Sequence, residues 1–152
     1  MALRNIMEQG EKCLEKHCRP VTDFNEKLHT LLDDMAAAWA KGAAAFESIA
    51  ARETGRRAVQ AREMARLGRY FWRTILTATH VKRGHLAEYR KDAEGVLKWA
   101  KAEYANATAA LALVEEDSRL GWEPSMEYAG GPEQIRWKLA RMEKLYGADL
   151  IK

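Results

Sequence analysis

The sequence predicts an all-α protein. The chain of 152 residues contains only three prolines and is 31% charged, and its abundance of Ala, Glu, Lys, Arg and Leu is typical of long helices. Val, Ile and Thr are sparse and do not alternate with polar residues, so no strand pattern is present. The length allows one domain with a core and is too short for two ordinary ones. We therefore expect a single helical-bundle domain over residues 1–152.

The first two predicted helices are separated by Pro20. Apolar residues follow a weak helical pattern over residues 3–19, which Pro20 ends. Asp23 and Glu26 then have the spacing of a capping box, which opens a second helix running to about Arg52. At about 100° per residue its apolar positions form one narrow stripe, which predicts a core-facing side. The stripe consists of Phe24, Leu28, Leu31, Met35, Trp39, Gly42, Phe46 and Ile49.

A third helix begins after the corner at Thr54-Gly55 and has the clearest segregation of residue types. Its apolar side, which we also expect to be buried, holds Met64, Leu67, Phe71, Ile75 and Ala78. Its opposite side holds Arg62, Arg66, Arg69 and Arg73. We expect this helix to continue through Gly84 to Tyr89, with a break at Gly84-His85 as the alternative.

Two further helices complete the predicted bundle. Asp92 is a good N-cap for a fourth helix, whose apolar residues recur in steps of three and four up to Glu116. A fifth helix begins at Gly131-Pro132, because proline at the first helical position loses no hydrogen bond, and Gly147 provides its stop. Three long helices, two shorter ones and a structured loop predict an antiparallel bundle.

The four arginines of the third helix are a candidate binding surface. A basic helix face can bind nucleic acid. However, this face lacks interleaved exposed aromatic residues and any recognised motif, which makes a nucleic-acid partner unlikely. We interpret Arg62, Arg66, Arg69 and Arg73 as a solvated face, or as a face that docks onto acidic residues of a neighbouring domain.

The sequence predicts no catalytic residue, cofactor or metal site. Cys13, His17 and Cys18 are too few for zinc, which needs about four ligands. The histidines are scattered, and His80 is interpreted as a residue at the edge of the core. No apolar run reaches the ~18 residues of a membrane span, and MALRNIMEQG lacks the core of a signal peptide. We therefore expect a cytoplasmic chain without a membrane partner, and its oligomeric state stays open.

The loop over residues 117–131 is unusually rich in aromatic residues and glycine. Three acids, residues 115–117, end a helix where the dipole disfavours them, so a cation such as Arg119, Arg136 or Lys138 should pair with them. The structural interpretation is a clasp between Asp117 and Arg119, with Trp122 packed over the bundle end. The alternative is that aromatic and carboxylate side chains contact a carbohydrate. Those side chains are Trp122, Glu123 and Tyr128.

Three segments carry a resemblance to a known class of proteins. They are VEEDSRLGWEPSMEY at 114–128, ARLGRYFWRTILTATHVKR at 65–83 and GGPEQIRWKL at 130–139. They resemble the C-terminal helical region of large bacterial glycoside hydrolases of the β-hexosaminidase-like and α-glucuronidase-like kind. In those proteins a catalytic barrel precedes the helical region. Because the barrel is absent here, no catalytic residue can be carried over.

The resemblance implies a non-catalytic helical module that forms the C-terminal part of a longer protein. Such a module would support a catalytic domain and contribute a loop to its carbohydrate-binding rim. From the residues alone, a different class is the alternative: a free-standing helical domain that dimerises or binds a partner helix.

Overall fold

The structure is a computed structural model that describes residues 26–121 and 130–150. It contains four α-helices and a final turn of 3-10 helix: α1 (Glu26–Arg52), α2 (Gly55–Tyr89), α3 (Ala93–Glu116), α4 (Pro132–Tyr146) and η1 (Gly147–Leu150). The described residues include no strand. The prediction of an all-α bundle is confirmed. The helix predicted over residues 3–19 lies outside the described residues.

The helix ends lie where the capping residues predict them. The Asp92 carboxylate accepts a hydrogen bond from the Gly95 N–H at 2.9 Å and so caps α3. Pro132 is the first residue of α4, and Gly147, with φ of 56°, ends it. α2 passes through Gly84 without a break. Local signals therefore account for the start of α3 and for both ends of α4, whereas the capping box predicted at Asp23 lies outside the described residues.

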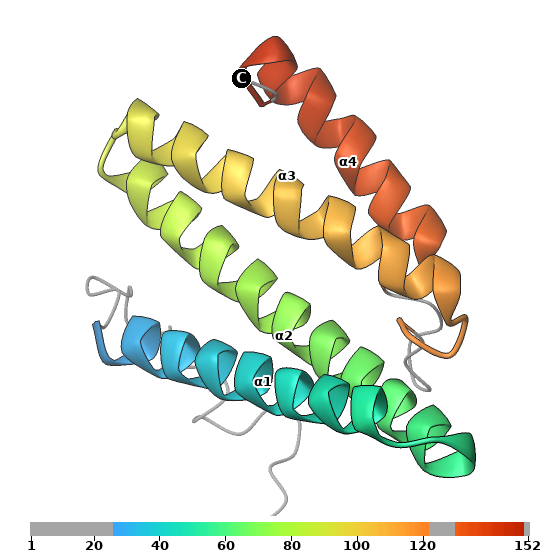
Figure 1. Cartoon of the computed structure of the whole chain (residues 1–152). Coiled ribbons are helices and arrows are strands. Elements are labelled where there is room, and N and C mark those ends of the chain that lie inside the picture. The colour runs from blue at the N-terminus through green and yellow to red at the C-terminus, as the bar shows by residue number, and fades with distance from the viewer. Residues whose placement is uncertain (1–25, 122–129, 151–152) are drawn as a thin grey trace, which may run out of the picture.

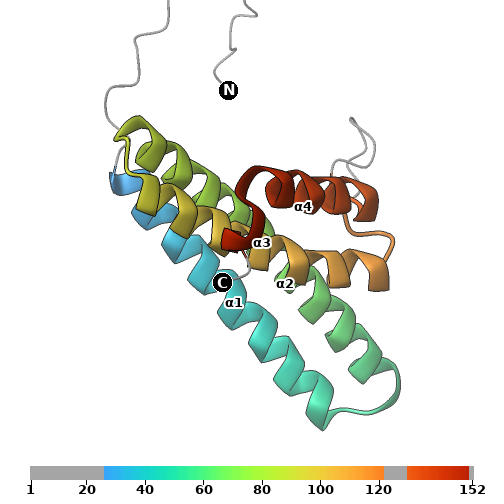
Figure 2. The same ribbon diagram turned by 90° about the horizontal axis from the view of Figure 1, so that it is seen from above.

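The helices follow one another in space in the same order as in the chain. α1 packs on α2, α2 on α3, and α3 on α4, with η1 against α3 and α4 (Figure 1). In both views α2 and α3 lie between α1 and α4 (Figure 2). Among the described elements α1 contacts α2 alone. No helix within residues 26–121 and 130–150 therefore covers the other side of the α1–α2 hairpin.

Small side chains form the interface between α1 and α2. A Cβ atom on Gly68 would lie only 3.2 Å from the Cβ of Ala43, so the two backbones approach closely. Such contacts give a thin core, because each residue buries little area. The buried small residues on the two helices are Ala36, Ala43, Ala58, Ala61, Ala65, Gly68, Thr79 and Ala87, and Leu32 is buried as well.

Most large apolar residues of the predicted stripes are exposed, contrary to the expectation that the stripes would be buried, although Ile75 is partly buried and Leu32, beside the stripe of α1, is buried. Nine of them keep between 36% and 54% of their surface accessible. The helical period sets the phase of a stripe but not which side meets the neighbour, and here the small residues beside each stripe allow the closer approach. We call these nine the α1–α2 apolar face: Leu28, Leu31, Met35, Trp39, Phe46, Ile49, Met64, Leu67 and Phe71.

Candidate functional site

A buried carboxylate lies where α2, α3 and α4 meet. Glu103 is only 4% exposed and belongs to α3. It lies one turn from both Ala100 and Ala107, which are buried as well, so the helix directs the charge into the bundle. Burying an ionised carboxylate is costly unless it is paired and hydrogen-bonded, so its partners determine what the site can do.

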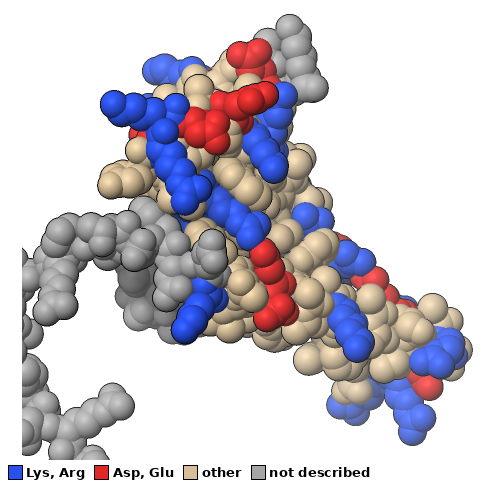
Figure 3. Space-filling model, turned by 90° about the vertical axis from the view of Figure 1, so that its left-hand side faces the viewer, with Lys and Arg blue, Asp and Glu red and all other residues tan. Residues whose placement is uncertain are grey.

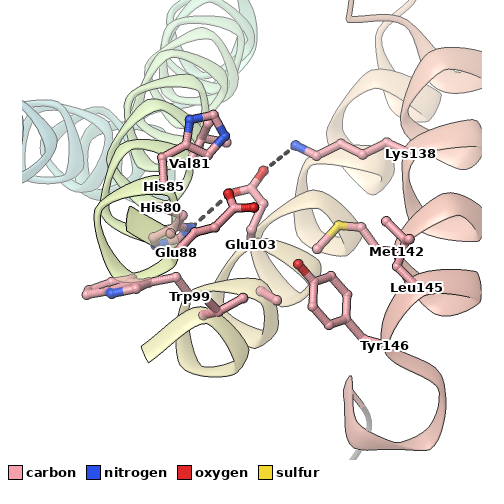
Figure 4. A pocket seen from close by; sticks show the side chains of 13 residues that line it. His80, Val81, His85, Glu88, Trp99, Glu103, Lys138, Met142, Leu145 and Tyr146 are labelled. Carbon is pink, nitrogen blue, oxygen red and sulfur yellow. Dashed lines mark hydrogen bonds and ion pairs between the residues drawn. The ribbon is translucent and has the colours of Figure 1, made fainter. Parts of the chain in front are cut away.

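Side chains of α2 and α4 donate to the Glu103 carboxylate, and Asn106 of α3 is bonded to the same group of residues. On α2, Thr77 Oγ1 donates to Glu103 Oε1 at 2.7 Å and His80 Nδ1 donates to Oε2 at 2.8 Å. Lys138 Nζ, from α4, donates to Oε1 (Figure 4). Asn106, one turn along α3, donates to the Arg73 carbonyl and to the Thr77 hydroxyl, at 3.0 Å each.

We call this group the Glu103 cluster: Arg73, Thr77, His80, Glu103, Asn106 and Lys138. Burial acts to raise the pKa of Glu103, but hydrogen bonds from His80, Lys138 and Thr77 together outweigh it and hold the pKa below its ordinary value. The carboxylate is therefore ionised at neutral pH. A weakly basic carboxylate is a poor general base, so the geometry suits a link between helices better than acid–base catalysis.

A cavity of about 350 Å³ adjoins the Glu103 cluster between α2, α3 and α4. Its walls include Trp99, Met142 and Tyr146, and the His80 ring stacks on Trp99 with centroids 5.9 Å apart (Figure 4). The volume falls within the range of about 300–1,000 Å³ that is typical of small-ligand sites. The polar atoms of the cluster are largely engaged with one another, which leaves few of them to orient a ligand.

The arginines of α2 were expected to form a solvated face or a free docking face, and the structure differs from this expectation. Three of the four bind other helices of the same chain. Arg66 pairs with Glu116 and lies 3.6 Å from Asp117. Arg69 holds both oxygens of the Glu47 carboxylate on α1.

Arg73 Nη1 donates to Asn106 Oδ1 at 3.3 Å, and its guanidinium lies over the Trp72 ring. Only Arg62 of the four is classed as exposed. The reason is the rotation of α2 about its own axis, which turns the arginines towards α1 and α3 and the apolar stripe outward. On the side of the molecule in Figure 3, basic side chains are interspersed with acidic and uncharged ones.

Asp117 and Arg119 are bonded to each other at the end of α3. Arg119 Nε and Nη2 donate to the two carboxylate oxygens at 2.9 and 2.7 Å, and the Arg119 N–H also donates to Oδ1. The Arg119 guanidinium and backbone N–H hold the pKa of the Asp117 carboxyl well below its usual range. Arg136 of α4 donates to Glu115 at 2.5 Å. The acids at this helix end thus have the cationic partners that the dipole argument requires.

The loop after the clasp starts and finishes at one point. The Gly130 N–H donates to the Gly121 carbonyl at 3.1 Å. Gly121 has φ of 83°, and a Cβ on it would lie 2.4 Å from the Gly130 oxygen, so only glycine fits there. Trp122, Glu123 and Tyr128, the predicted carbohydrate contacts, lie outside the described residues.

Neither a metal site nor a membrane-spanning helix is found within residues 26–121 and 130–150. No group of three or more His, Cys, Asp or Glu side chains there could hold a metal ion. Cys13, His17 and Cys18 lie outside this part. Each described helix is too short or too polar to cross a membrane.

The sequence did not indicate three members of the Glu103 cluster, Thr77, Glu103 and Asn106, and Lys138 was expected to pair with the acids at residues 115–117 instead of with Glu103. One signal was available, since a charged residue stands among the small apolar positions of the α3 stripe. Its partners come from two other helices, and no local pattern relates them. His80 was interpreted as a core-edge histidine, and it is a partly exposed member of the cluster.

Comparisons with known proteins add no further identification. No protein-family model, curated protein or solved structure matches the chain. The function must therefore be argued from the surfaces described above.

Proposed function

We propose that this chain is a helical protein-interaction module that binds another protein through the α1–α2 apolar face. The observation that carries this proposal is the continuity of that face. The Trp39 ring of α1 stacks on the Phe71 ring of α2, with centroids 4.9 Å apart and planes at 29°. Towards the hairpin tip, Phe46, Ile49 and Met64 line a shared hollow of about 250 Å³.

The extent of the face favours a protein partner. Aromatic side chains have roughly 150–250 Å² of surface, and Leu, Ile and Met lie towards the lower end of that range. With each of the nine about two-fifths exposed, the face offers on the order of 700 Å². Monomeric proteins rarely expose contiguous apolar patches above about 300–600 Å², and larger ones mark interaction sites.

The other candidate site gives weaker support for a function. The Glu103 cluster is buried and bonded within itself, which suits the internal stability of the chain. The supporting role towards a glycan-processing catalytic domain stays a prediction from the resemblance. It depends on loop residues outside the described part of the chain.

Site-specific photo-crosslinking tests the proposal. A photoreactive amino acid replaces Met35 on the apolar face, in cells that express the chain from its own gene. The matched control replaces Trp137 on α4, which is 71% exposed but lies away from the face. We expect one discrete protein adduct from position 35 and none from position 137. No adduct from position 35, or the same adduct from both positions, would contradict the proposal.

A further inference from the structure

We propose that the partner of the α1–α2 apolar face is a second copy of this chain, related by a two-fold axis that crosses α1 near Trp39. The inference rests on the proposed function and names its partner. The two copies of α1 run antiparallel in this dimer, and the α2 side of each face flanks the contact.

The first support is the size of the face. A stable interface of standard size buries about 800 Å² on each partner. The nine side chains supply on the order of 700 Å², and the small and polar residues around them add a rim. A second copy would bring a face of the same area and apolar character, and so would cover this one.

The second support is the internal symmetry of the stripe on α1. It extends from Leu28 to Ile49, a length of about 32 Å at 1.5 Å per residue. In an antiparallel pair of helices, residues equidistant from the axis face each other, and in a two-fold interface every such contact occurs twice. With the axis between residues 38 and 39, six stripe residues form three pairs, Leu28 with Ile49, Leu31 with Phe46, and Met35 with Gly42, and Trp39 lies beside the axis.

The third support is the fit of the Met35–Gly42 pair. A Cβ on Gly42 would meet no heavy atom within 4 Å, so nothing in the described chain fills this position. Glycine inside a helix costs about 1 kcal/mol relative to alanine, and no close contact within α1 and α2 requires it here. It leaves a notch between Trp39 and Phe46. The partner's Met35 faces that notch, and methionine is well suited to filling irregular gaps.

Charge at the hairpin tip favours the antiparallel orientation. Arg52, Arg56 and Arg57 outnumber Glu53 there, which lies 3.9 Å from the 83% exposed side chain of Arg57, so the tip keeps a net positive charge. A parallel dimer would bring the arginines of both tips together, and like charges facing each other oppose association. The antiparallel dimer separates the two tips by nearly the length of the hairpin.

Sedimentation equilibrium of the full chain, with an exchange of the two paired residues, tests the inference. We expect the wild type to dimerise at micromolar concentrations. Gly42→Met should weaken dimerisation by at least about 30-fold, because it overfills a central notch twice per dimer. Adding Met35→Gly should restore most of the loss, since the pair is then exchanged rather than overfilled. Ala44→Leu, an added side chain on α1 away from the face, should leave dimerisation within about threefold of wild type.

Cysteine cross-linking tests the orientation in a chain whose Cys13 and Cys18 are replaced by serine. Mixed Leu28→Cys and Ile49→Cys chains should form a disulfide between copies, whereas either variant alone should not. A disulfide between two Leu28→Cys chains would indicate a parallel arrangement and overturn the proposed axis.

Three results separate this inference from the proposed function. A wild type that stays monomeric, while position 35 crosslinks to a different protein, overturns the second copy and keeps the interaction module. A monomeric chain that loses stability when Met35 or Phe71 is replaced by Glu means that the face is covered within one chain, and both proposals fail. A dimer that Gly42→Met leaves intact overturns the proposed contact.

Discussion

The two sides of α2 pack against their neighbours through different kinds of residue. Towards α1, the buried positions of α2 include alanine and glycine, and the large apolar side chains lie outside. Where α2 meets α3 and α4, the buried residues include the carboxylate of Glu103 and the amide of Asn106. Burial of large apolar side chains therefore does not show what holds either contact together. The contact between α1 and α2 depends on the close approach of small residues. The contact of α2 with α3 and α4 depends on hydrogen-bonded polar side chains.

This comparison predicts different sensitivities. The α1–α2 interface should tolerate no added volume, because its helices are already in close contact. The Glu103 cluster should tolerate no lost partner, because an unpaired buried group keeps its desolvation cost. In the isolated monomer, neither added side-chain volume nor a lost contact on the α1–α2 apolar face should change the free energy of unfolding much.

Removing the central carboxylate should have the largest effect. Breaking a buried ion pair costs about 3–5 kcal/mol, and we expect Glu103→Ala near the lower figure because the Lys138 side chain is 32% exposed and can turn to water. Urea denaturation at neutral pH measures it. The control, Glu133→Ala, removes an ion pair whose carboxylate side chain is 82% exposed and should stay close to wild type. Equal losses from the two variants would mean that the cluster does not hold the helices together.

Overfilling the small-residue interface should come next. Ala43 is 2% exposed and faces Gly68, so Ala43→Leu should cost about 1–3 kcal/mol of unfolding free energy through strain. Ala44→Leu adds the same volume one residue along, at an exposed position. We expect that control to change stability by less than about 0.5 kcal/mol. If thermal denaturation shows no difference between the two, close packing is not what holds α1 on α2.

Acid should selectively weaken the contacts of the Glu103 cluster, which join α2, α3 and α4. Because the folded pKa of Glu103 lies below its unfolded value of about 4.3, the stability it contributes is complete above that value and is lost as pH falls through the folded pKa. The difference in unfolding free energy between wild type and Glu103→Gln should therefore be constant near neutral pH and shrink below about pH 4. A difference that grows on acidification would contradict the assigned charge state.

The arginines of α2 should show the smallest effects. Arg69 and Glu47 form a two-point contact, but their side chains are 38% and 42% exposed, and water screens the pair. Arg69→Ala should cost no more than about 1 kcal/mol, and Arg62→Ala, at an exposed position, should cost less. Guanidinium denaturation of the two variants compares them. A larger loss of unfolding free energy for Arg62→Ala than for Arg69→Ala would contradict the assignment of the side of α2 that faces the other helices.

Local features of this sequence predict local structure well. Asp92, Pro132 and Gly147 each act on adjacent backbone groups, so the described helix boundaries could be predicted, and Asp117 and Arg119 are two residues apart. The side of each helix that packs on its neighbour could not be predicted in this way. The spacing of a stripe gives the helical period but does not identify the packing partner. Leu67 looked like a core residue by its spacing, yet it is exposed. The Glu103 cluster brings together residues from three helices, and only the assembled fold makes it visible.

The most direct test of the account measures stability and association on the same variant. Leu31, which is 54% exposed, is the most exposed of the nine residues of the α1–α2 apolar face. For Leu31→Ala, we predict an unfolding free energy of the dilute monomer within about 0.5 kcal/mol of wild type, together with clearly weaker dimerisation in sedimentation equilibrium. A loss of about 2–5 kcal/mol in the monomer, as for a leucine in a core, with association unchanged, would contradict it.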